Sequence, residues 1–258
     1  MIITSVSNDK PKEIKKLIKS ASYRHEKGVF VVEGIRMFRE IPADIIEEVI
    51  VAKSQVEKFS SYLQIFGDDY IVVSDKVYAS ISDTGSPQGI MALVKIKKTT
   101  LSDVLPNEKV PNVLLLENLQ DPGNLGTIIR TAEGAGTTGI LLSKNSVDLY
   151  NPKVVRSTMG SIFRVPVYIS NDFVGDILEL KKKNVTIYGA HLNGKNIYDR
   201  DFTKPCGFLI GNEGNGLSDE VSELADDLIK IPMMGKVESL NAAISATLIS
   251  YEVLRQRL

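Results

Sequence analysis

Short apolar runs alternate with amphipathic stretches along most of the 258-residue chain. Helical patterns in the first part cover residues 54–66 and 75–81, and follow a helix that Ser7 or Asn8 can cap. Between these helices, runs rich in Val, Ile and Leu predict buried strands at residues 29–32, 49–51, 71–73 and 90–94. This alternation predicts a small α/β layer structure.

Predicted strands and helices also alternate in the second half of the chain, where a long helix is predicted at residues 240–258. The predicted strands are residues 113–116, 140–142, 165–168, 185–188, 208–210 and 228–231. Apolar strands separated by helices are typical of a parallel α/β sheet that is buried on both faces.

A polar stretch interrupts this alternation between the two halves. Residues 98–111 contain Pro106 and Pro111 around charged side chains and show neither a helical nor a strand period. The stretch predicts an N-terminal domain at residues 1–97, a linker at 98–111 and a C-terminal domain at 112–258.

Composition and charge narrow the class of protein. With 43% apolar and 24% charged residues, the chain has the composition of a soluble globular protein. The formal net charge of −1 argues against a protein that binds nucleic acid over its whole surface. The first 30 residues nevertheless carry seven Lys or Arg against three Asp or Glu. This surplus fits either a solvated helix face or a local contact with RNA.

Cysteine, histidine and long apolar segments are scarce. Cys206 is the single cysteine, which excludes an internal disulfide and fits a reducing cytoplasm. His25 and His191 are far apart and outside any ligand-spaced motif, so no metal site is expected. No stretch approaches the ~20 consecutive apolar residues that span a bilayer, so no membrane partner is expected.

Three loop segments each follow a predicted strand, so they can meet at the carboxyl edge of one parallel sheet, where ligands bind. In the first, Asp121-Pro122-Gly123 signals a turn, and Asn124 lies where a helix cap is expected. Arg130, on the following helix, could offer a guanidinium to a phosphate or a carboxylate. A surface arginine and a plain cap would explain the same residues.

The second segment, residues 211–216 (GNEGNG), is rich in glycine but matches neither a dinucleotide fingerprint nor a P-loop. Glu213 would repel a phosphate and is suited to bind an amine, a hydroxyl or an arginine. In the third segment, residues 231–241, Ser239 could be a helix cap, and Met233 and Met234 could fill a core.

Taken together, the three segments resemble the motifs of the SpoU (TrmH) family. The matching patterns are N-x-G-x-x-x-R-T-A at 124–132, G-N-E-G-x-G at 211–216 and I-P-M-x-G-x-x-x-S-L-N at 231–241. Members of that family are S-adenosylmethionine-dependent RNA ribose 2′-O-methyltransferases of the SPOUT class. Residues 30–34 and 88–90 resemble the ribosomal-protein-like RNA-binding domain that many members carry.

The resemblance implies a parallel sheet with a deep trefoil knot, a homodimer, and S-adenosylmethionine bound by the knotted loops. The cofactor pocket is expected to involve Leu209, Gly211, Ile231, Met233 and Leu240, largely through backbone groups. The predicted catalytic residues, which the resemblance places near the subunit interface, are Arg130, Asn124, Glu213, Ser239 and Asn241. Arg130 would either help to deprotonate the ribose 2′-OH or stabilise the developing alkoxide. The other four would orient Arg130, the ribose and the loops.

Two other classes of function are weighed against this one. A dinucleotide-dependent oxidoreductase would need an early G-x-G-x-x-G turn followed by an acidic residue, and the chain lacks that pair. A catalytically silent RNA-binding protein of the same fold would not need intact polar motif residues. Among RNAs, ribosomal RNA is favoured over transfer RNA because the N-terminal domain is of the ribosomal-protein type.

Overall fold

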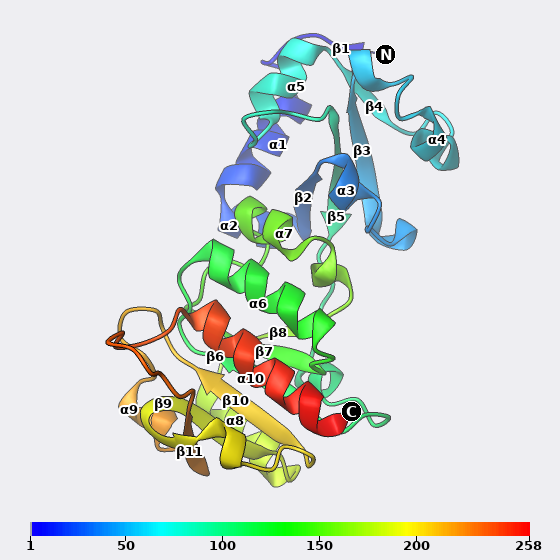
Figure 1. Ribbon diagram of the computed structural model, residues 1–258. Helices are drawn as coiled ribbons and strands as arrows, with labels where there is room; N and C mark the ends of the chain where they lie inside the picture. The colour runs from blue at the N-terminus through cyan, green and yellow to red at the C-terminus, as the bar shows by residue number, and fades with distance from the viewer. Residues whose placement is uncertain (1) are drawn as a thin grey trace. The chain divides into compact units, whose positions relative to one another are not determined.

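The computed structural model describes residues 2–258, and the chain divides into two compact units. Figure 1 shows the strands and helices of both. Among the described residues, the N-terminal unit contains 2–97 together with 148–163, and the C-terminal unit contains 98–147 and 164–258. Segment 148–163 comes from the second half of the chain but belongs to the N-terminal unit.

The N-terminal unit is built on a five-stranded mixed sheet with the order β1-β4-β3-β5-β2. β5 is antiparallel to β2 and β3, while β4 is parallel to β1 and β3. Its strands are β1 (Ile2–Ile3), β2 (Val29–Glu33), β3 (Ile46–Ala52), β4 (Ile71–Val73) and β5 (Ile90–Lys95). Its helices are α1 (Asp9–Lys19), α2 (Ala21–Lys27), α3 (Ile35–Phe38), α4 (Ser60–Leu63), α5 (Asp75–Ile81) and α7 (Pro152–Thr158).

Local signals explain where these elements begin and end. Asn8, one of the two expected caps, accepts a hydrogen bond from the Lys10 N–H at 3.0 Å and starts α1. Gly34 follows β2 with a φ of 95°, a backbone conformation that glycine adopts readily. The helix predicted at 54–66 is wrong in extent, because α4 is four residues long between two 3-10 turns. In that stretch only Phe59 and Leu63 are buried, so no continuous apolar stripe supports a long helix.

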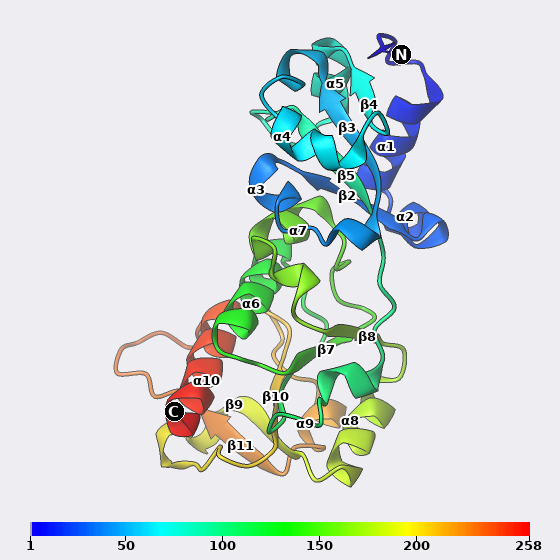
Figure 2. The same ribbon diagram turned by 90° about the vertical axis from the view of Figure 1, so that its right-hand side faces the viewer.

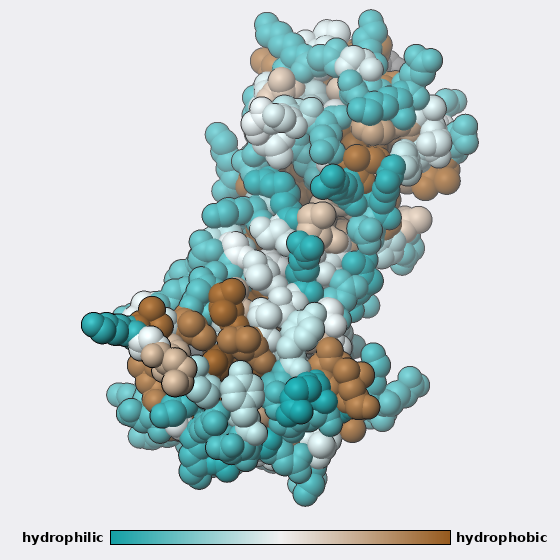
Figure 3. Space-filling view, viewed as in Figure 1, coloured by the Kyte–Doolittle hydropathy of each residue, from teal (hydrophilic) through white to brown (hydrophobic). Residues whose placement is uncertain are grey.

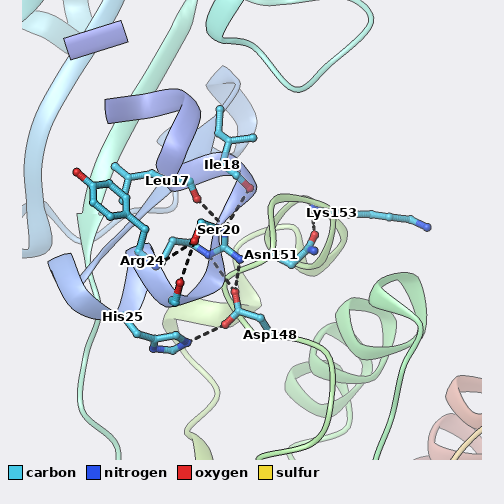
Figure 4. A network of polar contacts seen from close by, with 10 residues as sticks. Leu17, Ile18, Ser20, Arg24, His25, Asp148, Asn151 and Lys153 are labelled. Atoms are coloured by element: carbon cyan, nitrogen blue, oxygen red, sulfur yellow. Dashed lines mark hydrogen bonds and ion pairs between the residues drawn. The ribbon is translucent and has the colours of Figure 1, made fainter. Parts of the chain in front are cut away.

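Segment 148–163 packs within the N-terminal unit through an ion pair between its Asp148 and the buried Arg24, shown in Figure 4. Arg24, a residue that is 3% exposed, donates from its side chain to the carbonyls of Leu17 and Ile18 at 2.6 and 3.0 Å. Its Nε also donates to Asp148 Oδ2 at 2.9 Å. Nearby, the rings of Phe30 and Tyr150 have centroids 4.7 Å apart. These partners satisfy a guanidinium that burial would otherwise penalise.

The C-terminal unit is a six-stranded sheet, all parallel, with the order β11-β9-β10-β6-β7-β8. The predicted parallel α/β sheet is therefore confirmed. Its strands are β6 (Asn112–Leu116), β7 (Gly139–Ser143), β8 (Val167–Ser170), β9 (Thr186–Asn196), β10 (Cys206–Ile210) and β11 (Asp227–Lys230). Its helices are α6 (Pro122–Gly134), α8 (Phe173–Lys182), α9 (Asp219–Ser222) and α10 (Ala242–Arg257).

Helices cover both faces of this sheet, with α6 and α10 on one side and α8 on the other, as Figure 2 shows. On the α8 side, Ile177 and Leu180 join a core cluster with Val113, Leu115 and other strand residues. Leu114 and Leu116 alternate to the opposite face and are also fully buried. A sheet buried on both sides explains why its strands appear in the sequence as unbroken apolar runs.

The stretch predicted as a linker is part of the C-terminal unit's packing. A 3-10 turn at Leu101–Val104 places Val104 in the core, fully buried. Thr138 Oγ1 donates to the Val104 carbonyl at 2.9 Å, and a Cβ on Gly139 would lie 2.5 Å from the Val104 Cβ. This one apolar turn is too short to produce a period in the sequence.

Candidate active site

The three motif loops lie at the carboxyl ends of β6, β10 and β11, and therefore at one edge of the parallel sheet. The first and second loops follow neighbouring strands, because β6 pairs with β10 in parallel. The third follows β11, which is the edge strand beside β9. This meeting of the loops agrees with the sequence-based prediction.

Glu213 joins the second loop to the first. Its carboxylate accepts hydrogen bonds from the backbone N–H groups of Gln120 and Asp121 at 3.0 and 2.9 Å. It also accepts one from Asn124 Nδ2 at 3.0 Å. Partial burial opposes ionisation, but these donors outweigh it and hold the pKa of Glu213 below its usual range. The glutamate is therefore a fixed anion that binds protein N–H groups.

Asn124 also joins the first loop to the third. Its Oδ1 accepts from Asn241 Nδ2 at 2.9 Å, and Asn241 Oδ1 accepts from the Ala243 N–H at 2.8 Å. Glu213, Asn124 and Asn241 thus form a continuous hydrogen-bonded row across the three loops. A row of this kind fixes each side chain through its neighbour.

Two of the predicted caps are corrected by the structure. Asp121, rather than Asn124, caps α6 and accepts from the Asn124 N–H at 2.8 Å. Asn241, rather than Ser239, caps α10. In each case the helix begins where a side-chain oxygen can reach the free N–H groups. The Asn124 side chain is consequently free to bridge the loops.

Arg130 stands apart from this row. It lies on α6 and is exposed, and within residues 2–258 its guanidinium has no hydrogen bond or ion pair. The structure brings Asn124, Glu213 and Asn241 together, but it does not bring Arg130 into contact with them. An arginine in this setting keeps all its donors available for a ligand.

A cavity of about 370 Å³ opens beside the row of polar side chains. Four of the five residues expected at the cofactor line it: Gly211, Ile231, Met233 and Leu240. Ser239 lines it as well. The Leu209 side chain is fully buried in the core on the α8 side. Any contact of Leu209 with a ligand would therefore involve its backbone.

Glycine is required at the start of the second loop. A Cβ on Gly211 would lie 2.1 Å from the carbonyl carbon of Gly216 and 2.2 Å from the Leu217 nitrogen. Gly216 itself has a φ of 71°. The loop can fold back on itself beside the cavity only because these positions lack side chains.

Some lining residues were missed by sequence reasoning. Ala190, His191 and Leu192 of β9 and Ser245 and Ile249 of α10 line the cavity. The His191 Nδ1 accepts from the Asn193 N–H at 3.1 Å, which orients the ring. No motif marks the β9 residues; they reach the cavity because β9 lies between β10 and β11 in the sheet.

The size and lining of the cavity suit an adenosyl cofactor. Its volume lies within the ~300–1,000 Å³ usual for small-ligand sites. Apolar side chains such as Ile210, Ile231 and Leu240 can cover a purine and a ribose, while Lys230 and Glu238 supply charged groups at the same cavity.

Across residues 2–258, no three His, Cys, Asp or Glu side chains are grouped as metal ligands. Helices in the same range are all too short or too polar to cross a membrane.

Fold and site together define a parallel α/β domain whose three motif loops enclose a cofactor-sized cavity. Comparison with known proteins identifies the family. The model of the SpoU rRNA Methylase family matches residues 111–251, and that of the MRM3-like substrate binding domain matches residues 8–92. The 23S rRNA (guanosine(2553)-2′-O)-methyltransferase RlmP of Bacillus subtilis (strain 168) is 32% identical over 257 residues. That match covers 97% of this chain and 98% of RlmP.

Solved structures of two other proteins are similar to this chain along nearly its whole length. An AdoMet-bound rRNA methyltransferase from Sinorhizobium meliloti has a TM-score of 0.86 at 31% identity, covering 100% of this chain and 98% of that one. AviRb of Streptomyces viridochromogenes, in complex with the cofactor AdoMet, has a TM-score of 0.86 at 30% identity, covering 97% and 98%. The chain belongs to the SpoU rRNA methylase family.

Proposed function

We propose that this chain is an S-adenosylmethionine-dependent methyltransferase that acts on a ribose 2′-OH in ribosomal RNA. The observation that carries the proposal is the hydrogen-bonded row of Glu213, Asn124 and Asn241 beside a cofactor-sized cavity. Similarity along nearly the whole chain to methyltransferases named for ribosomal RNA supports both the reaction and the substrate.

The cofactor-binding residues are proposed to be those that line the cavity. Gly211, Ile231, Met233 and Leu240 would hold S-adenosylmethionine, with Leu209 contributing through its backbone. When bound, the cofactor supplies a methyl group on a positively charged sulfur. Transfer of this methyl group to the ribose 2′ oxygen would leave S-adenosylhomocysteine, and the hydroxyl proton would pass to solvent, directly or with the help of Arg130. The main contribution of the protein would be to align the methyl group with the 2′ oxygen, because the sulfonium is already a good leaving group.

Arg130 is proposed to contact the RNA. Its guanidinium is exposed and unpaired within residues 2–258, so it can bind a phosphate beside the target ribose. In that position it either helps to remove the 2′-OH proton or stabilises the developing alkoxide. The second role fits the positive charge of the guanidinium, which stabilises a developing negative charge. The loops and the ribose would be held in the correct orientation by four polar residues: Asn124, Glu213, Ser239 and Asn241.

The N-terminal unit is proposed to bind the RNA outside the target nucleotide. Two exposed lysines, Lys16 of α1 and Lys27 of α2, place their ammonium groups 3.9 and 5.6 Å from the centre of the Tyr23 ring. Within residues 2–258 neither lysine has an acidic partner, so positive charge is concentrated at this ring. An aromatic ring beside two cations suits RNA, which offers phosphates and base faces.

A homodimer is proposed through α10. This helix is apolar on two faces: Ala243, Ala246 and Ile249 are buried, whereas Ile244, Leu248 and Tyr251 are 49%, 37% and 47% exposed. Figure 3 shows apolar side chains gathered on the α10 side of the C-terminal unit. A helix with a second apolar face requires another surface to cover it, and a second copy would provide one. We place the protein in the cytoplasm, where its proposed RNA substrate is found.

The test is transfer of labelled methyl from S-adenosylmethionine to RNA from cells that lack this gene, followed by mapping of the modified nucleotide. We expect a single ribose-methylated position in ribosomal RNA. Arg130→Ala should lower transfer at least ~100-fold, the cost of removing one oxyanion-type contact, while cofactor binding persists. Label in transfer RNA alone would overturn the proposed substrate. Cofactor binding without label in any RNA would point to a missing assembly context or to a silent RNA-binding protein.

A further inference from the structure

A second set of contacts between the first and second loops is independent of Glu213. The Glu117 carboxylate, which follows β6 and is 6% exposed, accepts from the Ser218 Oγ at 2.6 Å and from the Ser218 N–H at 2.9 Å. Ser218 comes directly after Gly216 and Leu217, two residues that line the cavity. Glu117 therefore holds the far end of the glycine-rich loop.

The near end of the same loop is held by an amide. Asn212 Nδ2 donates to the Asn118 carbonyl at 2.8 Å, while its Oδ1 accepts from the Gly214 and Asn215 N–H groups at 2.9 and 3.1 Å. The backbones of Asn212 and Gly216 also pair with each other in both directions at 2.9 Å. One side chain thus shapes the turn and attaches it to the first loop.

We propose that Glu117 and Asn212 are positioning residues that hold the loop at residues 211–217 in the form that binds S-adenosylmethionine. The proposal rests on the proposed function. Within residues 2–258 the buried Glu117 carboxylate has no cationic partner, and both of its oxygens face Ser218. Burying a carboxylate is costly, and the two hydrogen bonds from Ser218 that offset this cost are ones that an apolar residue could not accept. Fixing a glycine-rich loop before the ligand arrives lowers the ordering cost of binding.

The experiment compares Glu117→Ala, Glu117→Gln and Asn212→Asp with wild type. Readouts are the dissociation constant for S-adenosylmethionine by calorimetry, kcat and KM for methyl transfer, and the temperature of unfolding without ligand. Glu117→Ala removes both hydrogen bonds, whereas Glu117→Gln keeps an oxygen for the Ser218 N–H. Asn212→Asp keeps the oxygen that shapes the turn but has no donor for the Asn118 carbonyl.

We expect Glu117→Ala and Asn212→Asp to raise both the dissociation constant and the KM for S-adenosylmethionine about tenfold, which corresponds to removing a cross-loop hydrogen bond of about 1.4 kcal/mol. At saturating cofactor, the kcat of Glu117→Ala should stay within about threefold of wild type, because Glu117 does not line the cavity. Glu117→Gln should restore most of the affinity.

The matched control is Glu252→Ala. Glu252 is a second buried carboxylate of the same unit, 5% exposed, which accepts from Arg255 and Gln256 and does not line the cavity. Its removal should lower the unfolding temperature and leave cofactor affinity unchanged. Unchanged affinity in both Glu117→Ala and Asn212→Asp would overturn the inference. A wild-type chain that binds no S-adenosylmethionine would instead refute the proposed function.

Discussion

The Asn124 side chain uses both ends of its amide, donating to Glu213 and accepting from Asn241. An aspartate in its place could not donate, and an alanine would leave two polar partners without a bond. The neighbouring Glu213 carboxylate is equally constrained, since its oxygens accept from two backbone N–H groups and from this amide. Loop geometry at the cavity therefore depends on the ionised form of one glutamate.

The first prediction concerns Glu213 and pH. Its pKa is lowered from the ordinary value of 4.5, so its contribution to loop order is present above that value and disappears as pH falls through the lowered pKa. We expect wild-type affinity for S-adenosylmethionine to be insensitive to Glu213 titration between about pH 5 and 8. Glu213→Gln, which turns an NH₂ group toward backbone donors, should bind the cofactor weakly throughout. Calorimetry across this range is the measurement.

A decline in wild-type affinity that begins near pH 6 and is absent from Glu213→Gln would contradict this assignment. Asp75 provides the control, because its pKa is also lowered but it lies in α5 of the N-terminal unit. Asp75→Asn should leave cofactor affinity and its pH profile unchanged.

At the scale of elements, α10 is a helix of the C-terminal unit that carries apolar side chains on two faces. Its buried side packs beside α6, and its other side presents Ile244, Leu248 and Tyr251 at the i, i+4 and i+7 spacing of one helix face. Glu252 is nevertheless buried near the end of the helix, bound to Arg255 and Gln256. The exposed apolar row is thus a feature of one face and not of a wholly apolar helix.

The second prediction tests that face. Leu248→Glu should convert a dimer into a monomer, because a charge in an apolar contact is left without a partner. Light scattering coupled to size-exclusion chromatography measures the mass. Leu178→Glu is the matched control: Leu178 lies on α8 and is 43% exposed, compared with 37% for Leu248. A Leu248→Glu chain that keeps the wild-type dimeric mass would exclude this face as the dimer interface.

For the molecule as a whole, charge is distributed unevenly although the total is −1. The lysines of α1 and α2 include two that converge on Tyr23, whereas the proposed cofactor cavity has Lys230 and Glu238 in its lining. Two separate tasks can therefore be assigned: attraction of RNA to the N-terminal unit and binding of a small cofactor in the C-terminal unit. RNA binding and cofactor binding can be measured separately.

The third prediction separates these tasks. The double variant Lys16→Glu with Lys27→Glu should bind ribosomal RNA more weakly and with a shallower salt dependence, by ~0.7–0.9 in the logarithmic slope for each phosphate that is no longer neutralised. Cofactor affinity should not change. Lys182→Glu with Lys183→Glu on and beside α8 makes the same change in net charge in the other unit and should keep RNA affinity. Filter binding at several salt concentrations measures both, and an equal weakening in the two double variants would refute a local RNA contact.

Much of the architecture follows from local patterns. Within residues 2–258, apolar runs predicted ten of the eleven strands, because each buried strand needs consecutive side chains that both faces of a sheet can accept. β1 was missed, since its two residues carry no period. The three motifs also marked the loops that meet at the sheet edge. The trefoil knot stays a prediction of the family resemblance.

Contacts between distant segments were decided only by the folded chain. The pairing of Glu117 with Ser218, the approach of β9 to the cavity and the packing of 148–163 with Arg24 join residues far apart in sequence. Neither propensity nor periodicity contains that information, because both describe neighbours along the chain. Strand and loop positions follow from short-range burial and turn chemistry. Which loops share a hydrogen bond depends on the order of strands in the sheet, and that order is set by packing the whole unit.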